Sequence, residues 1–391
     1  MNRWPLSFWQ SNGFVALNIV HVYSDGWQEF NSSRYRYLDM ARPLLAAGHR
    51  VFAPHVDQWF HQSEDIRFHC SRADLIIIQR VLVEESIDHV RAWRGRGKPL
   101  VVDFDDAYAL LRPEDGNQAT VFWYEGKVEV KHQTGISYWK VLDRHPLQQF
   151  YEGGRICTGF TMPSRILQAD YCWDTPCWFI PNFIWTPPYL KEKALRAKLP
   201  HRSDELIIGW GGSMSHINSF KRSGVSEALR RVFLKRRHVK FMLCGDQRIL
   251  PLLPLPANRI IFKQYVTWQD WPKILGLYDI GIAPLQGRYD SSRSQIKALE
   301  FSLMGIPFVA AGCPPYQDWM DEGIGSYIQD GPESESEKRA DEWEAKLIDL
   351  IDNYDYHAGL MGTKFDYAMT WDASANADNL VKIYEDIIDR G

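Results

Sequence analysis

Short apolar runs alternate with stretches of helical spacing along this chain, and the alternation occurs twice. In the first half, apolar runs predict strands at 14–22, 49–54, 75–79, 100–104, 156–162 and 178–181. A second series predicts strands at 206–210, 239–244, 259–262, 280–284 and 307–311. Apolar strands separated by helices are typical of parallel sheets with helices on both faces. The chain is therefore expected to be an α/β protein with two parallel sheets.

The length of the chain predicts two domains. A chain of 391 residues exceeds what one hydrophobic core usually serves. The strand series divide it into a first domain at 1–185 and a second at 205–372, joined by a charged, proline-containing linker at 186–204. Residues 373–391 predict an amphipathic helix that packs back on the first domain. Because such sheets bind ligands beyond the carboxyl ends of their strands, we expect a cleft between the domains to hold the site.

Composition limits the classes of function. A formal net charge of -4 argues against a protein whose main task is to coat nucleic acid. Six cysteines occur without a metal-ligand spacing, so reduced thiols and no zinc site are expected. We find neither the apolar core of a signal peptide nor the ~20 apolar residues that span a bilayer. The expected location is the cytoplasm, with a peripheral place at the inner face of the membrane as the alternative.

Basic residues concentrate at 230–238. The run contains Arg230, Arg231, Lys235, Arg236, Arg237 and His238, interleaved with apolar residues. One interpretation is the solvated face of a helix. The other is a dock for an anionic membrane or a polyanionic acceptor.

The segment at 279–312 carries the most informative charge pattern. It opens with an apolar strand, passes through a polar loop and enters a predicted helix at 293–304. Arg293, Lys297 and Glu300 stand at i, i+4 and i+7, on one face near the start of that helix. Two cations four residues apart repel each other, and a diphosphate between them reverses the sign of that interaction. On spacing alone, an exposed charged face is an equal alternative.

Neighbouring groups fit a bound nucleotide. Ser291, Ser292 and Ser294, with the free N–H groups of the helix start, add donors for an anion. Glu300 is expected to accept hydrogen bonds from ribose hydroxyls, each worth about 1.5–3 kcal/mol.

A glycine-rich turn follows the first strand of the second domain. Gly211, Gly212 and Ser213 let backbone N–H groups approach a phosphate, and His216 is a further donor. The turn matches neither the dinucleotide fingerprint nor the P-loop, because Met214 replaces the last glycine and no G-K-[ST] follows. A plain tight turn is the alternative.

Three aspartates end a predicted strand of the first domain. Asp103, Asp105 and Asp106 have three possible uses: to hold a divalent metal, to act as a general base, or to cap the next helix. The D-x-D spacing also occurs in metal-dependent enzymes of another fold, which a complete second domain argues against. We favour Asp105 and Asp106 as residues that face the substrate of the first domain, without a metal. Arg34 and Arg36 are placed in the same cleft, with an ordinary surface role as the equal alternative.

These motifs together resemble the retaining GT-B glycosyltransferases of the GT4-like group. The family shows a strand ending in A-P-L, a K-S-x-x-K-x-x-E helix and a G-x-P-V-V-A strand, here residues 283–285, 293–300 and 305–310. In the first domain, 32–51 is similar to its arginine-bearing helix and 98–108 to its strand ending in D-x-D-D. IPNFI at 180–184 resembles the hinge, and 207–216 the first glycine-rich turn.

The resemblance implies a glycosyltransferase that moves a sugar from a UDP- or GDP-sugar to an acceptor hydroxyl, with retention of configuration. It implies two Rossmann-like domains facing a central cleft, and no cofactor or metal beside the nucleotide-sugar. Arg34, Arg36 and Asp103 are expected on the acceptor side. The catalytic set is Asp105, Asp106 and Glu300, and the donor-binding set is Gly211, Gly212, Ser213, His216, Arg293, Ser294, Lys297 and Glu300.

The chain also departs from the family pattern. The position eight before Glu300 is Ser292, where the best-known form of the signature has glutamate, so the identity and orientation of the sugar are in doubt. Arg293 replaces the usual lysine, and guanidinium also pairs well with phosphate. The expected acceptor is a glycan or a lipid-linked glycan, with a modified DNA base as a minor alternative. A nucleotide-sugar epimerase of the same fold and a non-catalytic nucleotide-sugar-binding protein remain rival functions.

Overall fold

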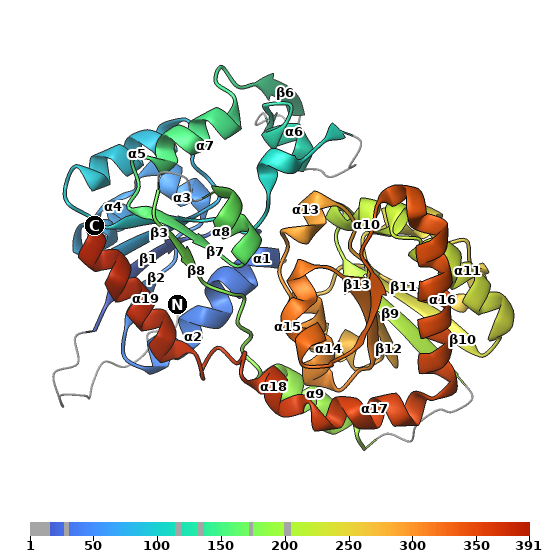
Figure 1. The fold of residues 1–391 in the computed structure, drawn as a ribbon. Helices are drawn as coiled ribbons and strands as arrows, with labels where there is room; N and C mark the ends of the chain where they lie inside the picture. Colours follow the sequence, from blue (N-terminus) through green and yellow to red (C-terminus); the bar gives the residue numbers. More distant parts are fainter. Residues whose placement is uncertain (1–15, 27–30, 114–118, 132–136, 172–174, 199–204) are drawn as a thin grey trace.

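The computed structural model describes residues 16–26, 31–113, 119–131, 137–171, 175–198 and 205–391 (Figure 1). It contains two six-stranded parallel sheets, each covered by helices. The predicted α/β class is therefore confirmed. Every strand range predicted from the sequence overlaps a strand of the structure.

The first sheet has the strand order β2-β1-β3-β4-β7-β8. Its strands are β1 (Asn18–Val22), β2 (Arg50–Phe52), β3 (Leu75–Gln79), β4 (Leu100–Asp103), β7 (Gly159–Met162) and β8 (Cys177–Phe179). The helices of this unit are α1 (Asn31–Ser33), a π-helical turn (Arg34–Leu38), α2 (Asp39–Ala46), α3 (Val56–His61), α4 (Glu64–Arg72), α5 (Glu85–Arg94), α6 (Ala119–Trp123), α7 (Pro146–Gly154) and α8 (Arg165–Tyr171). The central strands are buried on both faces: Ile76 and Ile78 of β3 pack in the core with α4 and α5, while Leu75 and Ile77 join the opposite core.

The second sheet has the order β11-β10-β9-β12-β13-β14. Its strands are β9 (Leu206–Gly212), β10 (Val239–Gly245), β11 (Ile260–Lys263), β12 (Ile280–Ala283), β13 (Phe308–Gly312) and β14 (Ser326–Gln329). The helices of this unit are α10 (Ile217–Arg222), α11 (Val225–Lys235), α12 (Trp271–Leu275), α13 (Arg288–Ser291), α14 (Ile296–Met304), α15 (Gln317–Asp321), α16 (Ser336–Asp352), α17 (Tyr354–Thr363) and α18 (Phe365–Met369).

The chain passes between the two units twice. The first passage contains α9 (Pro187–Arg196) within the predicted linker, and the two prolines at its start suit the first turn of a helix. On the return passage, Asp372 accepts hydrogen bonds from the backbone N–H and the hydroxyl of Thr186. The final helix, α19 (Ala377–Arg390), then lies against the first sheet (Figure 1). Its Leu380, Tyr384 and Ile387 share a core with β1, β3 and α2.

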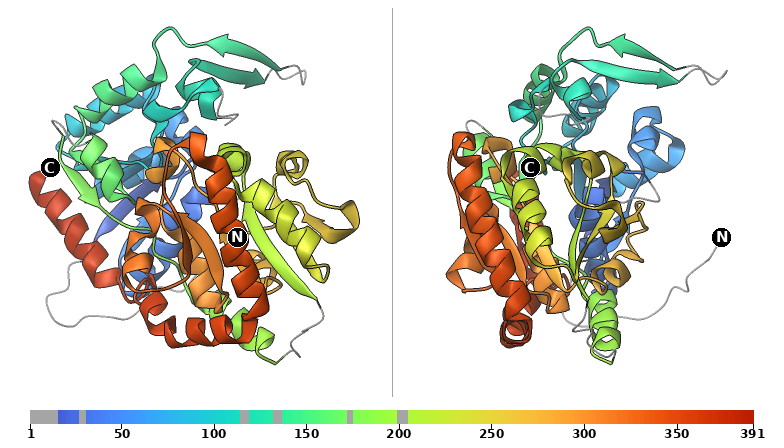
Figure 2. Two further views of the ribbon diagram at one scale, coloured as in Figure 1. Left: turned by 45° about the vertical axis from the view of Figure 1, so that its right-hand side comes forward. Right: turned by 90° about the vertical axis from the view of Figure 1, so that its right-hand side faces the viewer.

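Three strands were not predicted from the sequence. β14 is an edge strand with only Ile328 fully buried, so it lacks the continuous apolar run of the central strands. The other two form an antiparallel hairpin, β5 (Lys127–Lys131) and β6 (Ser137–Val141), which projects from the first unit (Figure 2). All five residues of β6 are exposed, because the hairpin belongs to neither large sheet.

Most of the basic run is ion-paired within the molecule, and Arg230 pairs with Glu227 of the same helix. Arg231 of α11 forms ion pairs with Glu227, Glu337 and Asp341. Lys235 pairs with Glu344, and Arg236 with Asp352. These carboxylates, apart from Glu227, belong to α16, which packs along α11 (Figure 1). The interpretation as a charged helix face is therefore favoured over a dock for polyanions.

The prediction of reduced thiols is wrong for Cys177 of β8, which is disulfide-bonded. Cys70, Cys157, Cys244 and Cys313 are free and buried. Among the described residues, no helix combines the length and apolar character needed to cross a bilayer.

Candidate active site between the two sheets

A cavity of about 400 Å³ lies between the carboxyl ends of the two sheets. Residues that directly follow β1, β3 and β4 line it from the first unit. The ends of β9 and β10, the loops after β11, β12 and β13, and the start of α14 line it from the second. Parallel strands bring these segments together because their carboxyl ends share one edge of each sheet.

The cavity gathers most of the predicted site. Eleven predicted residues line it: Arg34, Asp105, Asp106, Gly211, Gly212, Ser213, His216, Arg293, Ser294, Lys297 and Glu300. Two predicted acceptor-side residues, Arg36 and Asp103, do not.

Arg36 and Asp103 form a buried ion pair inside the first unit. Arg36 Nη2 lies 2.6 Å from Asp103 Oδ1, and Nε lies 3.0 Å from Oδ2. Asp103 also accepts a hydrogen bond from Thr161, and Arg36 donates to Asn182 Oδ1. Asp103 is the last residue of β4, so its side chain lies within the sheet layer, whereas Asp105 and Asp106 follow the strand. The prediction that Arg36 and Asp103 face the acceptor is therefore wrong, and the pair ties β4 to the loop after β8.

Arg293 does not belong to the helix predicted to begin there. The short α13 ends at Ser291, and α14 begins only at Ile296, so Arg293 lies in the connection between them. Its side chain still reaches the cavity, where Nη2 donates to Ser215 O at 2.9 Å. Its Nε lies 2.9 Å from Asp290 Oδ1, and Asp290 is buried. Arg293 and Lys297, which were predicted to share one helix face, therefore come from two segments: the connection after α13 and the start of α14.

Ser291 and Ser292 do not serve as the predicted anion donors. Ser292 is buried, and its hydroxyl donates to Arg288 O, while the Ser291 hydroxyl donates to Gly287 O. Ser294 does line the cavity, and its Oγ accepts a hydrogen bond of 2.8 Å from Asn182 of the first unit's last loop.

His216 supports Arg293 in this structure. Its Nε2 accepts from Arg293 Nη1 at 3.0 Å, so the ring proton is on Nδ1, which lies 3.5 Å from Ser219 Oγ. Burial, Arg293 and Lys297 together hold the pKa of His216 well below its usual value. In this state only Nδ1 can donate a hydrogen bond, and Nε2 could donate to a phosphate only after its contact with Arg293 breaks.

Lys297 is a partly buried cation without a counter-ion. Its ammonium donates to Gly211 O at 2.5 Å and lies 5.0 Å from the centroid of the Trp210 ring. Within the described part of the chain, no carboxylate lies within ion-pair distance of it. Burial lowers the pKa of Lys297 to about 8, against the attraction of Glu300. An anion in the cavity would supply the missing charge.

Glu300 joins three separate segments through one oxygen. Its Oε1 accepts from Tyr35 of the π-helical turn at 2.8 Å, from Tyr189 of α9 at 2.6 Å and from Trp271 of α12 at 2.8 Å. Arg34 lies beside the same group, with its guanidinium 5.3 Å from the Tyr189 ring centroid. These contacts give Glu300 a structural role in addition to the predicted one toward ribose.

Glu300→Gln is therefore expected to lower stability. A neutral amide oxygen replaces a charged acceptor of three buried hydrogen bonds, and charge-assisted bonds are about twice as strong as neutral ones. We expect the thermal unfolding midpoint to fall by about 2–4 °C for each kcal/mol lost, measured by calorimetry. An unchanged midpoint would show that the three bonds carry no net stability.

The two glycines of the turn are required by aromatic packing. A Cβ on Gly211 would lie 2.2 Å from the Trp271 ring, and one on Gly212 would lie 2.8 Å from the Trp210 ring. The Ser213 hydroxyl is 2.7 Å from that of Ser215. The turn therefore brings its backbone close to Lys297 and Trp271 at the wall of the cavity.

Asp105 and Asp106 face the second unit from the end of β4. Asp106 accepts a hydrogen bond from Tyr289, and burial raises its pKa to about 6, partly offset by Arg293 and augmented by Asp105. Asp105 accepts from the Tyr108 hydroxyl at 2.6 Å and lies 3.4 Å from Arg80 Nε. Among the described residues, no group of three or more His, Cys, Asp or Glu is arranged to hold a metal ion.

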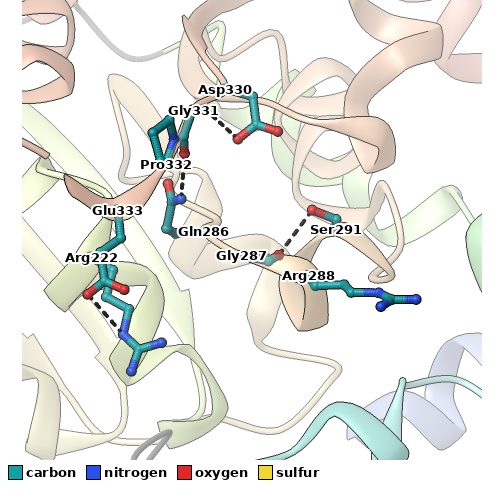
Figure 3. A pocket seen from close by; sticks show the side chains of 9 residues that line it. All are labelled: Arg222, Gln286, Gly287, Arg288, Ser291, Asp330, Gly331, Pro332 and Glu333. Atoms are coloured by element: carbon teal, nitrogen blue, oxygen red, sulfur yellow. Dashed lines mark hydrogen bonds and ion pairs between the residues drawn. The ribbon is translucent and has the colours of Figure 1, made fainter. Parts of the chain in front are cut away.

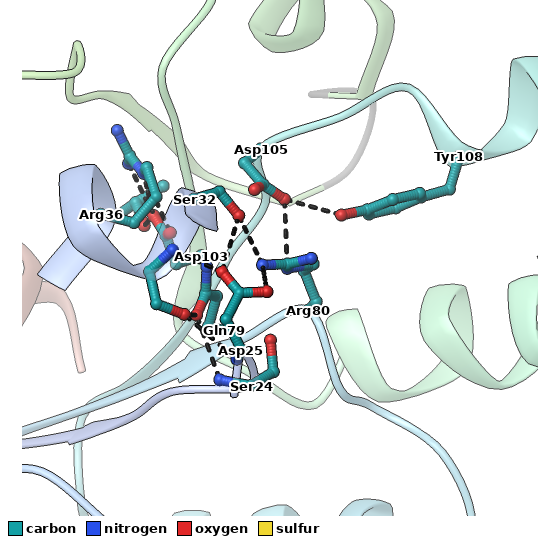
Figure 4. Close-up of polar contacts among 11 residues, drawn as sticks. Ser24, Asp25, Ser32, Arg36, Gln79, Arg80, Asp103, Asp105 and Tyr108 are labelled. Carbon is teal, nitrogen blue, oxygen red and sulfur yellow. Dashed lines mark hydrogen bonds and ion pairs between the residues drawn. The ribbon is translucent and has the colours of Figure 1, made fainter. Parts of the chain in front are cut away.

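Arg80 is the main site residue that the sequence analysis missed. It follows β3 with a φ of 59°, a left-handed conformation that is strained for arginine. Its Nη2 donates to Asp25 at 2.6 Å and to Ser32 at 2.5 Å (Figure 4). No motif marks Arg80, because the sequence does not show that the ends of β1, β3 and β4 meet.

A second cavity of about 410 Å³ is lined by residues of α13 and of the loops after β12 and β14 (Figure 3). It is lined by polar residues whose groups bond to one another, as in the Arg222–Glu333 ion pair and the bond from Gln286 to Gly331 O. Of the residues predicted for the site, only Ser291 lines it, and the Ser291 hydroxyl is bonded to Gly287 O. The cavity between the two sheets is therefore the candidate active site.

Solved structures resemble the chain over nearly its whole length. Anabaena HepE, solved with UDP and glucose, is 15% identical, with a TM-score of 0.60 over 95% of this chain and 100% of HepE. A glycosyltransferase from Rickettsia africae is 11% identical, with a TM-score of 0.59 over 97% and 100%. A UDP-forming trehalose-phosphate synthase from Burkholderia xenovorans is 9% identical, with a TM-score of 0.56 over 95% and 99%.

The sequence matches no protein-family model and no curated protein. At these low identities, the likeness to solved structures concerns the fold. Together with the two parallel sheets and the cavity between them, it shows that this chain has the GT-B glycosyltransferase fold.

Proposed function

We propose that this chain is a glycosyltransferase that moves a sugar from a UDP-sugar to an acceptor hydroxyl, with retention of configuration. The observation that carries the proposal is the unpaired Lys297 beside Arg293 on the second unit's wall, opposite Asp105 and Asp106 on the first. The second unit binds the donor, and the first binds the acceptor.

A diphosphate suits the second wall. A partly buried cation without a counter-ion is unfavourable, so an anion next to Lys297 is stabilising. Arg293 has five N–H groups, and only one on each terminal nitrogen is used by His216 and Ser215. The start of α14 adds the positive end of a helix dipole, because Ile296 and Lys297 both line the cavity.

UDP is favoured over GDP by the solved structures of similar fold, since HepE was solved with UDP and the trehalose-phosphate synthase is UDP-forming. The sugar remains open, because Ser292 is buried and bonded to Arg288 O at the position where the family signature has glutamate.

Asp106 is the acceptor-side residue with the most suitable chemistry. A carboxylate with a pKa of about 6 is ionised at neutral pH and still basic enough to accept a proton. In a retaining reaction the leaving diphosphate also helps to deprotonate the incoming hydroxyl. Arg293 and Lys297 would then stabilise the charge that develops on that diphosphate. Closure of the two units would exclude water from the reacting bond.

The proposed acceptor is a glycan or a lipid-linked glycan. A modified DNA base is disfavoured, because three cations of the basic run that would suit DNA, Arg231, Lys235 and Arg236, are paired with carboxylates of α16.

The decisive experiment combines binding and turnover. Thermal shift with UDP, GDP and their sugars should show the largest stabilisation with UDP compounds, because a ligand that binds only the folded state raises the melting point. Incubation of the stabilising UDP-sugar with an acceptor panel should release UDP and form a glycoside. Conversion of the donor without any acceptor would instead indicate an epimerase, and binding without turnover a sensor.

The affinity for UDP is expected to depend on pH through Lys297. Its pKa of about 8 in the free protein rises when a diphosphate binds, so affinity holds below pH 8 and is lost above it. The loss approaches about tenfold per pH unit, since one unit of pKa corresponds to about 1.4 kcal/mol. Isothermal titration calorimetry between pH 7 and 9.5 measures it. Lys297→Arg should remove the loss, because guanidinium stays charged throughout; the same slope in both proteins would contradict the assignment.

A further inference from the structure

The first unit's wall of the cavity is a polar network built from four segments. Asp25 follows β1, Ser32 belongs to α1, Arg80 follows β3, and Asp105 and Tyr108 follow β4 (Figure 4). All five side chains line the cavity opposite Lys297 and the glycine-rich turn.

Hydrogen bonds hold this network in one geometry. Arg80 Nη2 bridges Asp25 and Ser32, and Asp25 also accepts from the backbone N–H of Ser33 at 2.7 Å. On the other side, Tyr108 donates to Asp105 Oδ1, which lies 3.4 Å from Arg80 Nε. The wall is preorganised, because each charged group is fixed by neighbours on a different segment.

Hydrogen-bonding capacity remains toward the cavity. Within the described part of the chain, neither Nη1 of Arg80 nor Oδ2 of Asp105 has a protein partner. One is a donor and the other an acceptor, and a sugar hydroxyl can bond to both kinds of group.

The charge on this wall is negative. Asp25, Asp105 and Asp106 contribute three carboxylates, and Arg34 and Arg80 contribute two cations. Arg34 is already ion-paired with Asp39, which does not line the cavity, so the wall keeps an excess of negative charge. The positive groups that face a diphosphate, Arg293 and Lys297, lie on the opposite wall. A phosphate or carboxylate on the acceptor would meet like charge at short range in a site where screening by water is reduced.

We infer that the wall formed by Asp25, Ser32, Arg80, Asp105 and Tyr108 is the acceptor subsite, and that it takes an uncharged sugar rather than a phosphorylated or acidic one. The inference rests on the proposed function and names its acceptor class. Arg80 and Asp105 bind neighbouring hydroxyls of that sugar, and Asp106 lies at the hydroxyl that reacts.

Matched acceptors test this inference. A panel of neutral hexosides and N-acetylhexosaminides is compared with the 6-phosphate and uronate forms of the same rings, with a UDP-sugar donor. We expect kcat/KM for at least one neutral member to exceed that of its anionic forms by about tenfold or more, the factor that corresponds to about 1.4 kcal/mol. Equal or faster transfer to anionic members, or transfer to no neutral member, would overturn it.

Asp105→Asn supplies a second readout. Removing one carboxylate should raise the ratio of kcat/KM for the anionic acceptor to that for its neutral form, by about tenfold for a close charge. Asp25→Asn should shift the same ratio in the same direction if Asp105→Asn proves unstable. Asp88→Asn, an equal change on a residue of α5 whose side chain is 73% exposed, should leave the ratio unchanged. An unchanged ratio in both site variants would overturn the subsite.

The failure of this inference can be told apart from failure of the proposed function. UDP binding by calorimetry depends on the second unit's wall and is independent of the acceptor. If UDP binds and the acceptor preference is absent, the subsite assignment alone is wrong. If no nucleotide binds, the proposed function fails first.

Discussion

Arg293→Gln is expected to weaken UDP binding by about 10²–10⁴-fold. The substitution removes the guanidinium that lies beside Lys297 at the cavity and replaces it with a shorter, neutral group. Two charge-assisted hydrogen bonds to a diphosphate, at about 1.5–3 kcal/mol each, account for that range. Isothermal titration calorimetry with UDP measures the effect directly.

Arg288→Gln is the matched control. Arg288 lies five residues earlier, lines the second cavity instead of the candidate active site, and has a side chain that is 73% exposed. Its loss should leave UDP affinity unchanged. Because Arg293 also neutralises Asp290, the unfolding midpoint of Arg293→Gln must be measured beside binding. Arg293→Lys keeps the charge and should retain part of the affinity; an Arg293→Gln protein that is folded and binds UDP normally would remove Arg293 from the donor site.

Asp106→Asn is expected to lower kcat by about 10²–10⁴-fold, the usual contribution of a positioned acid or base. UDP affinity should be unchanged or higher, because the carboxylate that attracts Arg293 is lost. Steady-state kinetics with a saturating UDP-sugar measures kcat, and calorimetry measures the affinity. Asp88→Asn again serves as the control. If Asp106→Asn keeps the full kcat, Asp106 is not the base, and the leaving diphosphate alone accepts the proton of the acceptor hydroxyl.

The pH profile supplies an independent check on Asp106. With a pKa of about 6, the group is ionised above pH 6, so kcat of the wild type should rise through that value. The stability effect has the opposite sign. The folded pKa lies above the ordinary 3.8, so between pH 4 and 6 the folded state holds the extra proton, and stability falls as pH rises through this window. Asp106→Asn should therefore have an equal or higher unfolding midpoint at pH 7.

Much of the fold could be predicted, because the burial of a central strand on both faces is visible in a short stretch of sequence. The central strands are apolar on both faces, as in Leu75–Gln79, and this pattern marks a strand between two helical layers. The hairpin and β14 escaped prediction because they are not buried on both sides. The end of α13 and the start of α14 also escaped it, since both helices lie within one stretch of suitable residues.

The candidate site divides in the same way. The second unit's residues occur in two short segments, at 211–216 and 293–300, each with a recognisable local pattern. Lys297, Arg293 and the glycine-rich turn were therefore predictable, and all of them line the cavity. The first unit's wall comes from strand ends far apart in sequence. Nothing local separates Asp103, in a buried pair with Arg36, from Asp105, which faces the cavity. Arg80 carries no motif at all.

The sequence by itself determined the two parallel sheets, the cationic segment around Lys297 and the group of candidate donor residues, because burial and helical spacing are properties of neighbouring residues. Only the tertiary structure decided which charges are paired. Three cations of the basic run pair with carboxylates of α16, and Arg36 and Asp103 form a buried ion pair. Lys297 has no counter-ion among the residues that the structure describes. Ion pairing depends on distances of a few ångströms between segments that the fold alone brings together, and those distances separate a binding site from a structural contact.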